Sequence, residues 1–174
     1  MSKIDYDLRK IRGVAFDVDG VLSPSTVPMS ENGEPMRMVN IKDGYAMQLA
    51  VKCGIKIAII TGARTPGIVA RYNALGIHDV FLGASDKLPI LAQWMSTNGL
   101  KREEVAFVGD DIPDLPCLRG VGLPATPADG AVELRIEARY ISGCAGGYGV
   151  ARDILEEILK ARGQWLENAE AFGW

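Results

Sequence analysis

The chain has 174 residues, of which 48% are hydrophobic and 24% are charged, and its formal net charge is −3. This length suits one domain with a sizeable core, and the composition is normal for a soluble globular protein. The slightly acidic charge, without a basic cluster, argues against nucleic acid as a partner, and an anionic substrate would need local cations or a metal ion.

Four short apolar runs have the composition of buried strands. They are rich in β-branched and aromatic residues, and they cover residues 13–16, 56–60, 79–82 and 104–108. The stretches between them have helical spacing, over residues 43–53, 65–75 and 86–98. Because strands and helices alternate, we predict an α/β fold: a three-layer, Rossmann-like parallel sheet with helices on both faces.

Residues with strong positional preferences mark where these helices begin and end. Asp43 and Asp86 are predicted N-caps, and Pro66 falls in a first turn, where proline is tolerated. A glycine follows each helical stretch, as is common at helix C-termini: Gly54, Gly76 and Gly99.

Residues 23–41 break this alternation, because they are too polar and too rich in proline for a helix. Asn32-Gly33 is a strong hairpin-turn signal, so we predict a β-hairpin that projects from the domain just after the first strand. The alternative is a disordered surface loop. A projecting hairpin would expose several apolar side chains, which favours contact with a partner subunit: Met29, Met36, Met38 and Val39.

The C-terminal part contains a glycine-rich stretch (142–149), followed by an amphipathic helix and a tail over residues 150–174. The glycine-rich stretch lacks the Gly-Lys-Ser/Thr ending of a phosphate-binding loop, which disfavours a nucleotide site. We expect the tail to dock on protein through its aromatic side chains, Trp165, Phe172 and Trp174.

Cysteine usage and the first residues indicate a reducing cytoplasm. Cys53, Cys117 and Cys144 form no CxxC pair and no Cys/His cluster, so neither a disulfide framework nor a zinc site is expected. The stretch 1–10 lacks the apolar run of a signal peptide, and no segment approaches the roughly 18 apolar residues of a membrane span.

Polar residues gather directly after the predicted strands. In chain order they are Asp17 and Asp19; Thr61, Gly62 and Arg64; Lys87; and Asp110, Asp111 and Asp114. Ligands of doubly wound sheets bind beyond the carboxyl ends of the strands, so we expect these four loops to form one site.

The acids at this edge suit phosphoryl chemistry assisted by a metal ion. Asp17 and Asp110 can share Mg²⁺, which prefers oxygen ligands. A carboxylate on that cation can attack phosphorus, because the cation relieves the repulsion between two anions. Asp19 can protonate a leaving oxygen and later deprotonate a water molecule.

Thr61, the Gly62 amide and Lys87 complete the predicted site. The first two can hydrogen-bond phosphoryl oxygens, and Lys87 can neutralise the charge that develops on them. Each motif alone also has a structural explanation, as a turn, a solvated helix residue or a helix cap. The catalytic site is the better hypothesis, because four turns would otherwise carry these residue types in this order by accident.

In their order along the chain, these motifs resemble those of the haloacid dehalogenase-like (HAD) phosphohydrolases. "DVDGV" is similar to their first motif, "IITG" to the second, Lys87 to the third and "GDDIPD" to the fourth. The resemblance implies that Asp17 is the nucleophile that becomes a phosphoaspartate, and that Asp19 is the general acid/base. The other implied roles are Mg²⁺ ligation by Asp17, the Asp19 backbone carbonyl and Asp110, support of the metal site by Asp111, and phosphate binding by Thr61 and Lys87.

The spacing of the motifs leaves no room for a cap domain. "VGDDIPDLPCLRGVGL" and "GCAGGYGVARDILE" are similar to the capless phosphatases of 3-deoxy-D-manno-octulosonate 8-phosphate (KDO8P). This resemblance implies a Mg²⁺-dependent phosphatase that releases phosphate from KDO8P. The alternatives are a phosphatase of N-acylneuraminate or KDN 9-phosphate, and a non-catalytic oligomerisation module of a cytidylyltransferase system.

The same resemblance implies a homotetramer, in which hairpins pack together and C-terminal segments approach neighbouring active sites. It also implies that Arg64 binds the substrate carboxylate, although a surface arginine is an equal alternative. Two departures leave the exact sugar open. Ser23-Pro24-Ser25 stands where relatives often have an acidic residue and glycine, and Tyr148 stands where they often have arginine.

Overall fold

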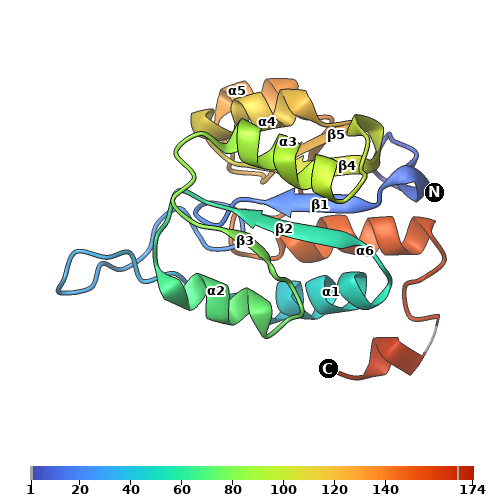
Figure 1. Cartoon of the computed structure of the whole chain (residues 1–174), viewed down its shortest axis with the longest axis horizontal. Coiled ribbons are helices and arrows are strands. Elements are labelled where there is room, and N and C mark those ends of the chain that lie inside the picture. The colour runs from blue at the N-terminus through green and yellow to red at the C-terminus, as the bar shows by residue number, and fades with distance from the viewer. Residues whose placement is uncertain (1, 168) are drawn as a thin grey trace.

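The computed structural model describes residues 2–167 and 169–174, and its centre is a six-stranded sheet. The strands lie in the order β3-β2-β1-β4-β5-β6, and all neighbouring strands are parallel (Figure 1). Their bounds are β1 Gly13–Phe16, β2 Lys56–Ile60, β3 Asp79–Phe81, β4 Val105–Val108, β5 Leu123–Thr126 and β6 Tyr140–Ile141. The predicted parallel sheet is therefore confirmed, and β5 and β6 extend it beyond the four predicted strands.

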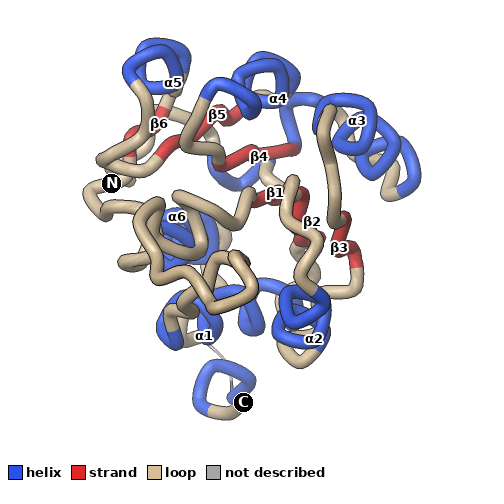
Figure 2. The backbone as a smooth tube through the Cα atoms, turned by 90° about the vertical axis from the view of Figure 1, so that its left-hand side faces the viewer, coloured by secondary structure: helices blue, strands red, loops and turns tan. Residues whose placement is uncertain are grey.

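Helices cover both faces of the sheet and make the three predicted layers (Figures 1 and 2). One face carries α1 (Ile41–Lys52), α2 (Pro66–Asn73) and α6 (Val150–Ala161). The other carries α3 (Lys87–Thr97), α4 (Leu115–Gly120) and α5 (Val132–Glu137). Four short 3₁₀ helices, η1 to η4, span Leu8–Lys10, Arg102–Glu104, Ile112–Asp114 and Ala169–Phe172.

The central strand β1 is buried along its whole length and separates two apolar clusters. Val14 and Phe16 face the α1/α2/α6 layer, and Ala15 faces the α3/α4/α5 layer, as strand alternation requires. Burying each such large side chain stabilises the fold by about 1.5–3 kcal/mol. This packing fixes the end of β1, from which the loop that carries Asp17 and Asp19 leaves.

Helix α1 begins earlier than the sequence predicts. Its N-cap is Asn40, whose side-chain oxygen accepts from Lys42 N at 2.9 Å and from Asp43 N at 3.1 Å. The expectation that Asp43 is the N-cap is therefore wrong. The Asp43 carboxylate points away from its own helix and accepts from Arg152 N at 2.7 Å, at the start of α6. It thus joins the first turns of two packed helices.

Asp43 gives the protein a predicted pH dependence. Its side chain is buried, its Oδ2 has no partner among the described residues, and burial raises the pKa to about 6 from 3.8. The folded state therefore favours the protonated acid, so this group's contribution to stability is full below pH ~4 and is lost as pH rises through ~6. Asp43→Asn should raise the free energy of unfolding at pH 8 by on the order of 2 kcal/mol.

Urea unfolding of the wild type and of Asp43→Asn between pH 5 and pH 8 checks this expectation. The variant should lose less stability than the wild type as the pH rises. Parallel curves for the two proteins would show that the carboxylate is solvated and that its burial costs nothing.

Residues 23–40 form a long projecting loop on the side towards which the strand arrows of Figure 1 point. The chain reverses at Asn32-Gly33, as predicted, and Met29 and Pro35 form an antiparallel bridge. Regular strands do not form in this segment, all of which is described. Met29 is 74% exposed, and the other three apolar side chains predicted to be exposed are at least 47% exposed.

The C-terminal tail folds back on the α1 layer of its own chain. Trp165 is buried against Tyr45, and the Tyr45 hydroxyl donates to the Ala171 carbonyl. Trp174 also contacts Tyr45 edge-on but stays largely exposed, as does Phe172, and Asn168 lies outside the described residues. In the described part of the chain, no helix has the length and apolar character needed to cross a membrane.

Candidate active site

The carboxyl ends of β1, β2 and β4 border a cavity of about 620 Å³. Because all strands are parallel, the loops that follow them leave the sheet on the same side. The lining includes Asp17, Asp19, Thr61, Gly62, Lys87, Asp110, Asp111 and Asp114. The structure therefore brings the four predicted loops together.

A buried lysine lies at the centre of this cavity. Lys87, the first residue of α3, is only 6% exposed, and its Nζ lies 2.8 Å from Asp17 Oδ2 and 2.6 Å from Asp114 Oδ1. Burial alone would lower the pKa of Lys87, but the two carboxylates outweigh it and raise that pKa. Lys87 is therefore a fixed positive charge beside the two acids.

The carboxylates around Lys87 repel one another. Burial, assisted by the charge of Asp114, raises the pKa of Asp17 to about 7. Burial, with the charge of Asp17 as the next cause, raises the pKa of Asp110 to about 7. One lysine thus does not neutralise this cluster, and a further cation would relieve the remaining repulsion.

The acidic cluster fits a hard divalent cation. Asp17, Asp110 and Asp114 each offer an oxygen within 4.8 Å of the others, and Mg²⁺ takes such oxygen ligands. Asp17 and Asp114 each already bind Lys87 and one backbone amide, from Val18 N at 2.7 Å and from Asp110 N at 3.0 Å, so Asp110 is the carboxylate of the three that is freest to ligate. Gly20 is required here, because a Cβ at its φ of +81° would lie 1.9 Å from Asp110 Oδ2.

Asp19 lies at the edge of the cavity and is held by an arginine from the projecting loop. Arg37 Nε donates to Asp19 Oδ1 at 2.6 Å, and Arg37 Nη2 donates to Asp19 Oδ2 at 2.8 Å. Arg37 Nη1 donates to Thr65 Oγ1 at 3.0 Å. The projecting loop therefore contributes a cation to the site, which the sequence motifs did not predict.

Thr61 lies on the floor of the cavity and is held by its own loop. It is buried, its Oγ1 accepts from Ala63 N at 3.2 Å, and its carbonyl accepts from Ala84 N at 2.9 Å. Arg64, by contrast, is exposed, lies against Gly83 and is not among the described residues that line the cavity. The structure does not bring Arg64 to the site.

The acids of the fourth loop have different roles in the structure, which the motif alone does not reveal. Asp111 is exposed, and its Oδ1 accepts from Ile112 N at 2.8 Å, so it caps the η3 turn. Asp114 is 1% exposed and orients both Lys87 and the Asp110 amide. The sequence placed Asp114, the third acid of "GDDIPD", at this edge of the sheet without a role, and its role in the structure is to orient these two groups.

Relatives of known activity match the chain over most of its length, although no family model matches. The 3-deoxy-D-manno-octulosonate 8-phosphate phosphatase of Escherichia coli (strain K12) is 37% identical over 160 residues, which are 92% of this chain and 85% of that protein. The chain belongs to this phosphatase family.

Solved structures of the octulosonate 8-phosphate phosphatase family share the fold. The Yersinia pestis enzyme is 35% identical with a TM-score of 0.87, covering 91% of this chain and 85% of that one. The Moraxella catarrhalis enzyme, solved with a magnesium ion, a phosphate ion and a KDO molecule, is 32% identical with a TM-score of 0.85, covering 90% of each chain. The cobalt-bound Haemophilus influenzae enzyme has a TM-score of 0.89 at 29% identity, covering 95% and 98%.

In this member of the octulosonate phosphatase family, the glycine-rich stretch 142–149 packs against the loop that carries Asp17 and Asp19. A Cβ on Gly146 would lie 1.9 Å from the Gly20 carbonyl oxygen, and Gly147 N donates to Val21 O at 2.8 Å. Ser25 lines the cavity, whereas Ser23 is buried and its Oγ accepts from Met38 N at 3.0 Å. The glycines thus allow close backbone contact and hold the loop that carries Asp19.

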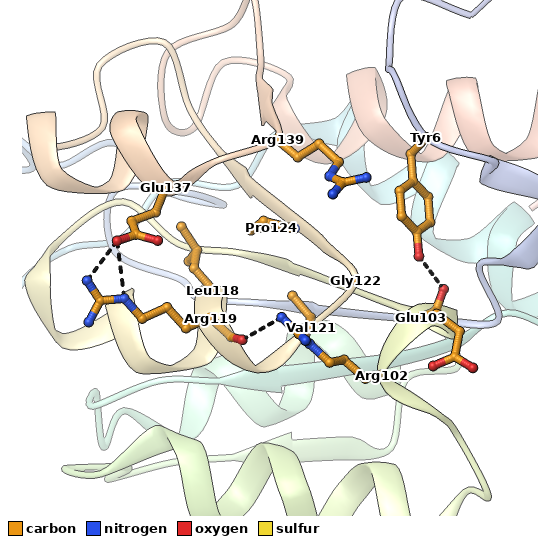
Figure 3. A pocket seen from close by; sticks show the side chains of 10 residues that line it. All are labelled: Tyr6, Arg102, Glu103, Leu118, Arg119, Val121, Gly122, Pro124, Glu137 and Arg139. Carbon is orange, nitrogen blue, oxygen red and sulfur yellow. Dashed lines mark hydrogen bonds and ion pairs between the residues drawn. The ribbon is translucent and has the colours of Figure 1, made fainter.

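A second cavity, of about 650 Å³, lies at the amino ends of β4 and β5, whereas Asp17, Thr61 and Asp110 lie at the carboxyl ends of the strands (Figure 3). Its polar groups bond one another. Arg119 pairs with Glu137 at 2.7 Å, the Arg119 carbonyl accepts from Arg102, and the Tyr6 hydroxyl donates to the Glu103 carbonyl. In the phosphatase fold, the Tyr6 contact joins the N-terminal segment to η2, and the two Arg119 contacts join α4 to α5 and to η2.

Proposed function

We propose that this protein is a Mg²⁺-dependent phosphatase that hydrolyses KDO8P to KDO and phosphate, and that residues 1–174 act as one phosphatase domain with 23–41 as an insertion. The observation that carries the proposal is the buried Asp17–Lys87–Asp114 cluster beside Asp110. The substrate follows from the relatives, since the Escherichia coli protein bears this name and the Moraxella catarrhalis structure contains KDO and phosphate.

The contacts of Asp17 support its role as the nucleophile. Val18 N donates to its Oδ1 at 2.7 Å, and Lys87 holds its Oδ2, so the carboxylate is oriented before the substrate arrives. Attack on phosphorus forms the phosphoaspartate and breaks the bond between phosphorus and the sugar oxygen. Thr61, the Gly62 amide and Lys87 bind the phosphoryl oxygens during this transfer.

Asp19 moves the proton in both steps. It protonates the leaving sugar oxygen in the first step, and it deprotonates the water that hydrolyses the acylphosphate in the second. Mg²⁺, held by Asp17, Asp110 and the Asp19 carbonyl, supplies charge that lets a carboxylate approach a phosphate dianion.

Phosphate release from a panel of sugar phosphates, with Mg²⁺ and with a chelator, tests the function. We expect release from KDO8P with Mg²⁺ and none with the chelator. Asp110→Asn should weaken Mg²⁺ binding in titration calorimetry, whereas the exposed Asp111→Asn should weaken it less. Preference for N-acylneuraminate or KDN 9-phosphate, judged by kcat/KM, would overturn the substrate but not the phosphatase.

We further propose that the protein assembles as a homotetramer through the projecting loop. The exposed apolar side chains of this loop support the proposal, because a monomer would leave them in water: Met29, Met36, Met38 and Val39. The C-terminal tail, in contrast, packs on α1 of the same chain in this structure.

Light scattering during size-exclusion chromatography should give the mass of four chains. Met29→Glu/Met36→Glu should lower that mass, because two carboxylates would have to be desolvated at each contact. A wild-type mass of one chain would contradict the assembly.

A further inference from the structure

The catalytic cavity holds few cations for a substrate with two anionic ends. Among the described residues that line it, the cations are Lys87 and Arg37. Lys87 is already bound by Asp17 and Asp114, deep in the cavity where the phosphate would lie. Within this cavity, Arg37 is therefore the cation that remains for a second anionic group.

Arg37 stands where two cavities meet. It lines the catalytic cavity and also a neighbouring cavity of about 380 Å³ between the projecting loop and α2. This neighbouring cavity is bordered by apolar side chains that include Met36, Ile68 and Tyr72, and its lining also contains Arg71. A sugar whose phosphate reaches Lys87 would extend past Arg37.

The Arg37 guanidinium is built to hold a carboxylate. Its side chain is only 12% exposed, two of its nitrogens bind the two oxygens of Asp19, and the third is held by Thr65. This bidentate geometry is the one that arginine forms with carboxylates in general. Asp19, however, must reach the leaving sugar oxygen and the attacking water, and it cannot give both oxygens to Arg37 while it does so.

We propose that Arg37 binds the carboxylate of the substrate, and that Asp19 occupies this position only until the substrate arrives. The exchange replaces one carboxylate by another on the same guanidinium, so no buried charge is left unpaired. It also releases Asp19 towards the reacting phosphate. Substrates without a carboxylate would leave Asp19 bound. The inference rests on the proposed function and assigns to Arg37 the role that the family resemblance implied for Arg64.

Kinetics with two substrates test the proposal. In Arg37→Met, kcat/KM for KDO8P should fall by about 10- to 100-fold, mainly through KM, as expected for the loss of a charge-assisted bidentate pair. With arabinose 5-phosphate, which has no carboxylate, kcat/KM should fall at least about tenfold less than with KDO8P, and urea unfolding should show that Arg37→Met is folded. Arg37→Lys should recover part of the loss.

Two outcomes would overturn the proposal. An equal loss on both substrates would mean that Arg37 acts only by positioning Asp19 or binds phosphate. If kcat/KM for KDO8P fell selectively in Arg64→Met and not in Arg37→Met, Arg64 would be the residue that binds the substrate carboxylate.

Binding of KDO, the sugar acid without phosphate, keeps this test separate from that of the function. Titration calorimetry of wild type with KDO should show binding that Arg37→Met weakens by a similar factor, whether or not KDO8P is turned over. Unchanged KDO binding in Arg37→Met would contradict the inference. If Arg37→Met binds KDO more weakly but the wild type does not hydrolyse KDO8P, only the proposed reaction would be contradicted.

Discussion

Asp17→Asn should abolish phosphate release, with kcat at least about 10⁴-fold lower, because the amide is a poor nucleophile and removing a covalent nucleophile costs losses of this size. Asn can still accept the Val18 amide hydrogen at the position where Asp17 Oδ1 accepts it now. The active-site geometry should therefore persist. Lys87 also keeps its other partner, Asp114.

The same variant should not lose stability. Burial raises the pKa of Asp17 to about 7 from 3.8, so the metal-free folded protein favours a neutral group there. The stabilising contribution of that protonated group is full below pH ~4 and is lost as pH rises through ~7. Asn is neutral at every pH, so at pH 8 the variant should unfold at the same temperature as the metal-free wild type or at a higher one.

Activity assays in Mg²⁺ and thermal unfolding in chelator check the two halves of this prediction. Residual turnover within about tenfold of wild type, on protein free of contaminating phosphatase, would exclude Asp17 as the nucleophile. A large drop in the unfolding temperature would instead show that the ion pair with Lys87 stabilises the fold more than burial of the charge destabilises it.

Lys87→Met should be the most destabilising single change in the site. It leaves the Asp17 and Asp114 carboxylates buried without their cation, and breaking a buried pair in this way costs about 3–5 kcal/mol. Lys87 holds down the pKa of Asp17, which is about 7 in the wild type, so Asp17 should take up a proton at a higher pH in the variant, and the loss should shrink as the pH falls towards 7. Activity should disappear as well, since the phosphoryl oxygens lose their positive partner.

The double variant Asp17→Asn/Lys87→Met separates charge from packing. Urea unfolding at pH 8 should find it more stable than Lys87→Met, because only one carboxylate remains beside the methionine. If the double variant were as unstable as Lys87→Met, the lysine would matter for its shape and not for its charge.

The sequence predicts those parts of the fold in which local pattern and tertiary packing agree. Strands β1, β2, β3 and β4 are marked by apolar runs, because strands covered on both faces need no polar alternation. Strand β6 has two residues, and helices α4 and α5 have six each, too few to show a period. Strand β5 carries Pro124, which argues against a strand in sequence although β5 pairs on both sides.

The site residues likewise divide into those that a local sequence pattern marks and those that depend on tertiary packing. Asp17, Thr61, Lys87 and Asp110 could be predicted because each stands directly after a strand or at the start of the next helix. Arg37 could not, because the contact that brings it to Asp19 depends on the course of the projecting loop. Asp43 was assigned as an N-cap by a local rule, but Asn40 caps that helix and the carboxylate binds the distant α6.

The contact between Gly20 and Gly146 has a consequence for how the enzyme matures on the ribosome. The loop that carries Asp19 is held by a segment near the other end of the sequence, so it cannot settle until that segment has left the exit tunnel. Such long-range contacts also slow folding, since the entropy of closing the intervening chain is lost before the contact forms. Catalytic competence should therefore appear late in synthesis, after the nucleophile strand and both phosphate-binding loops have been made.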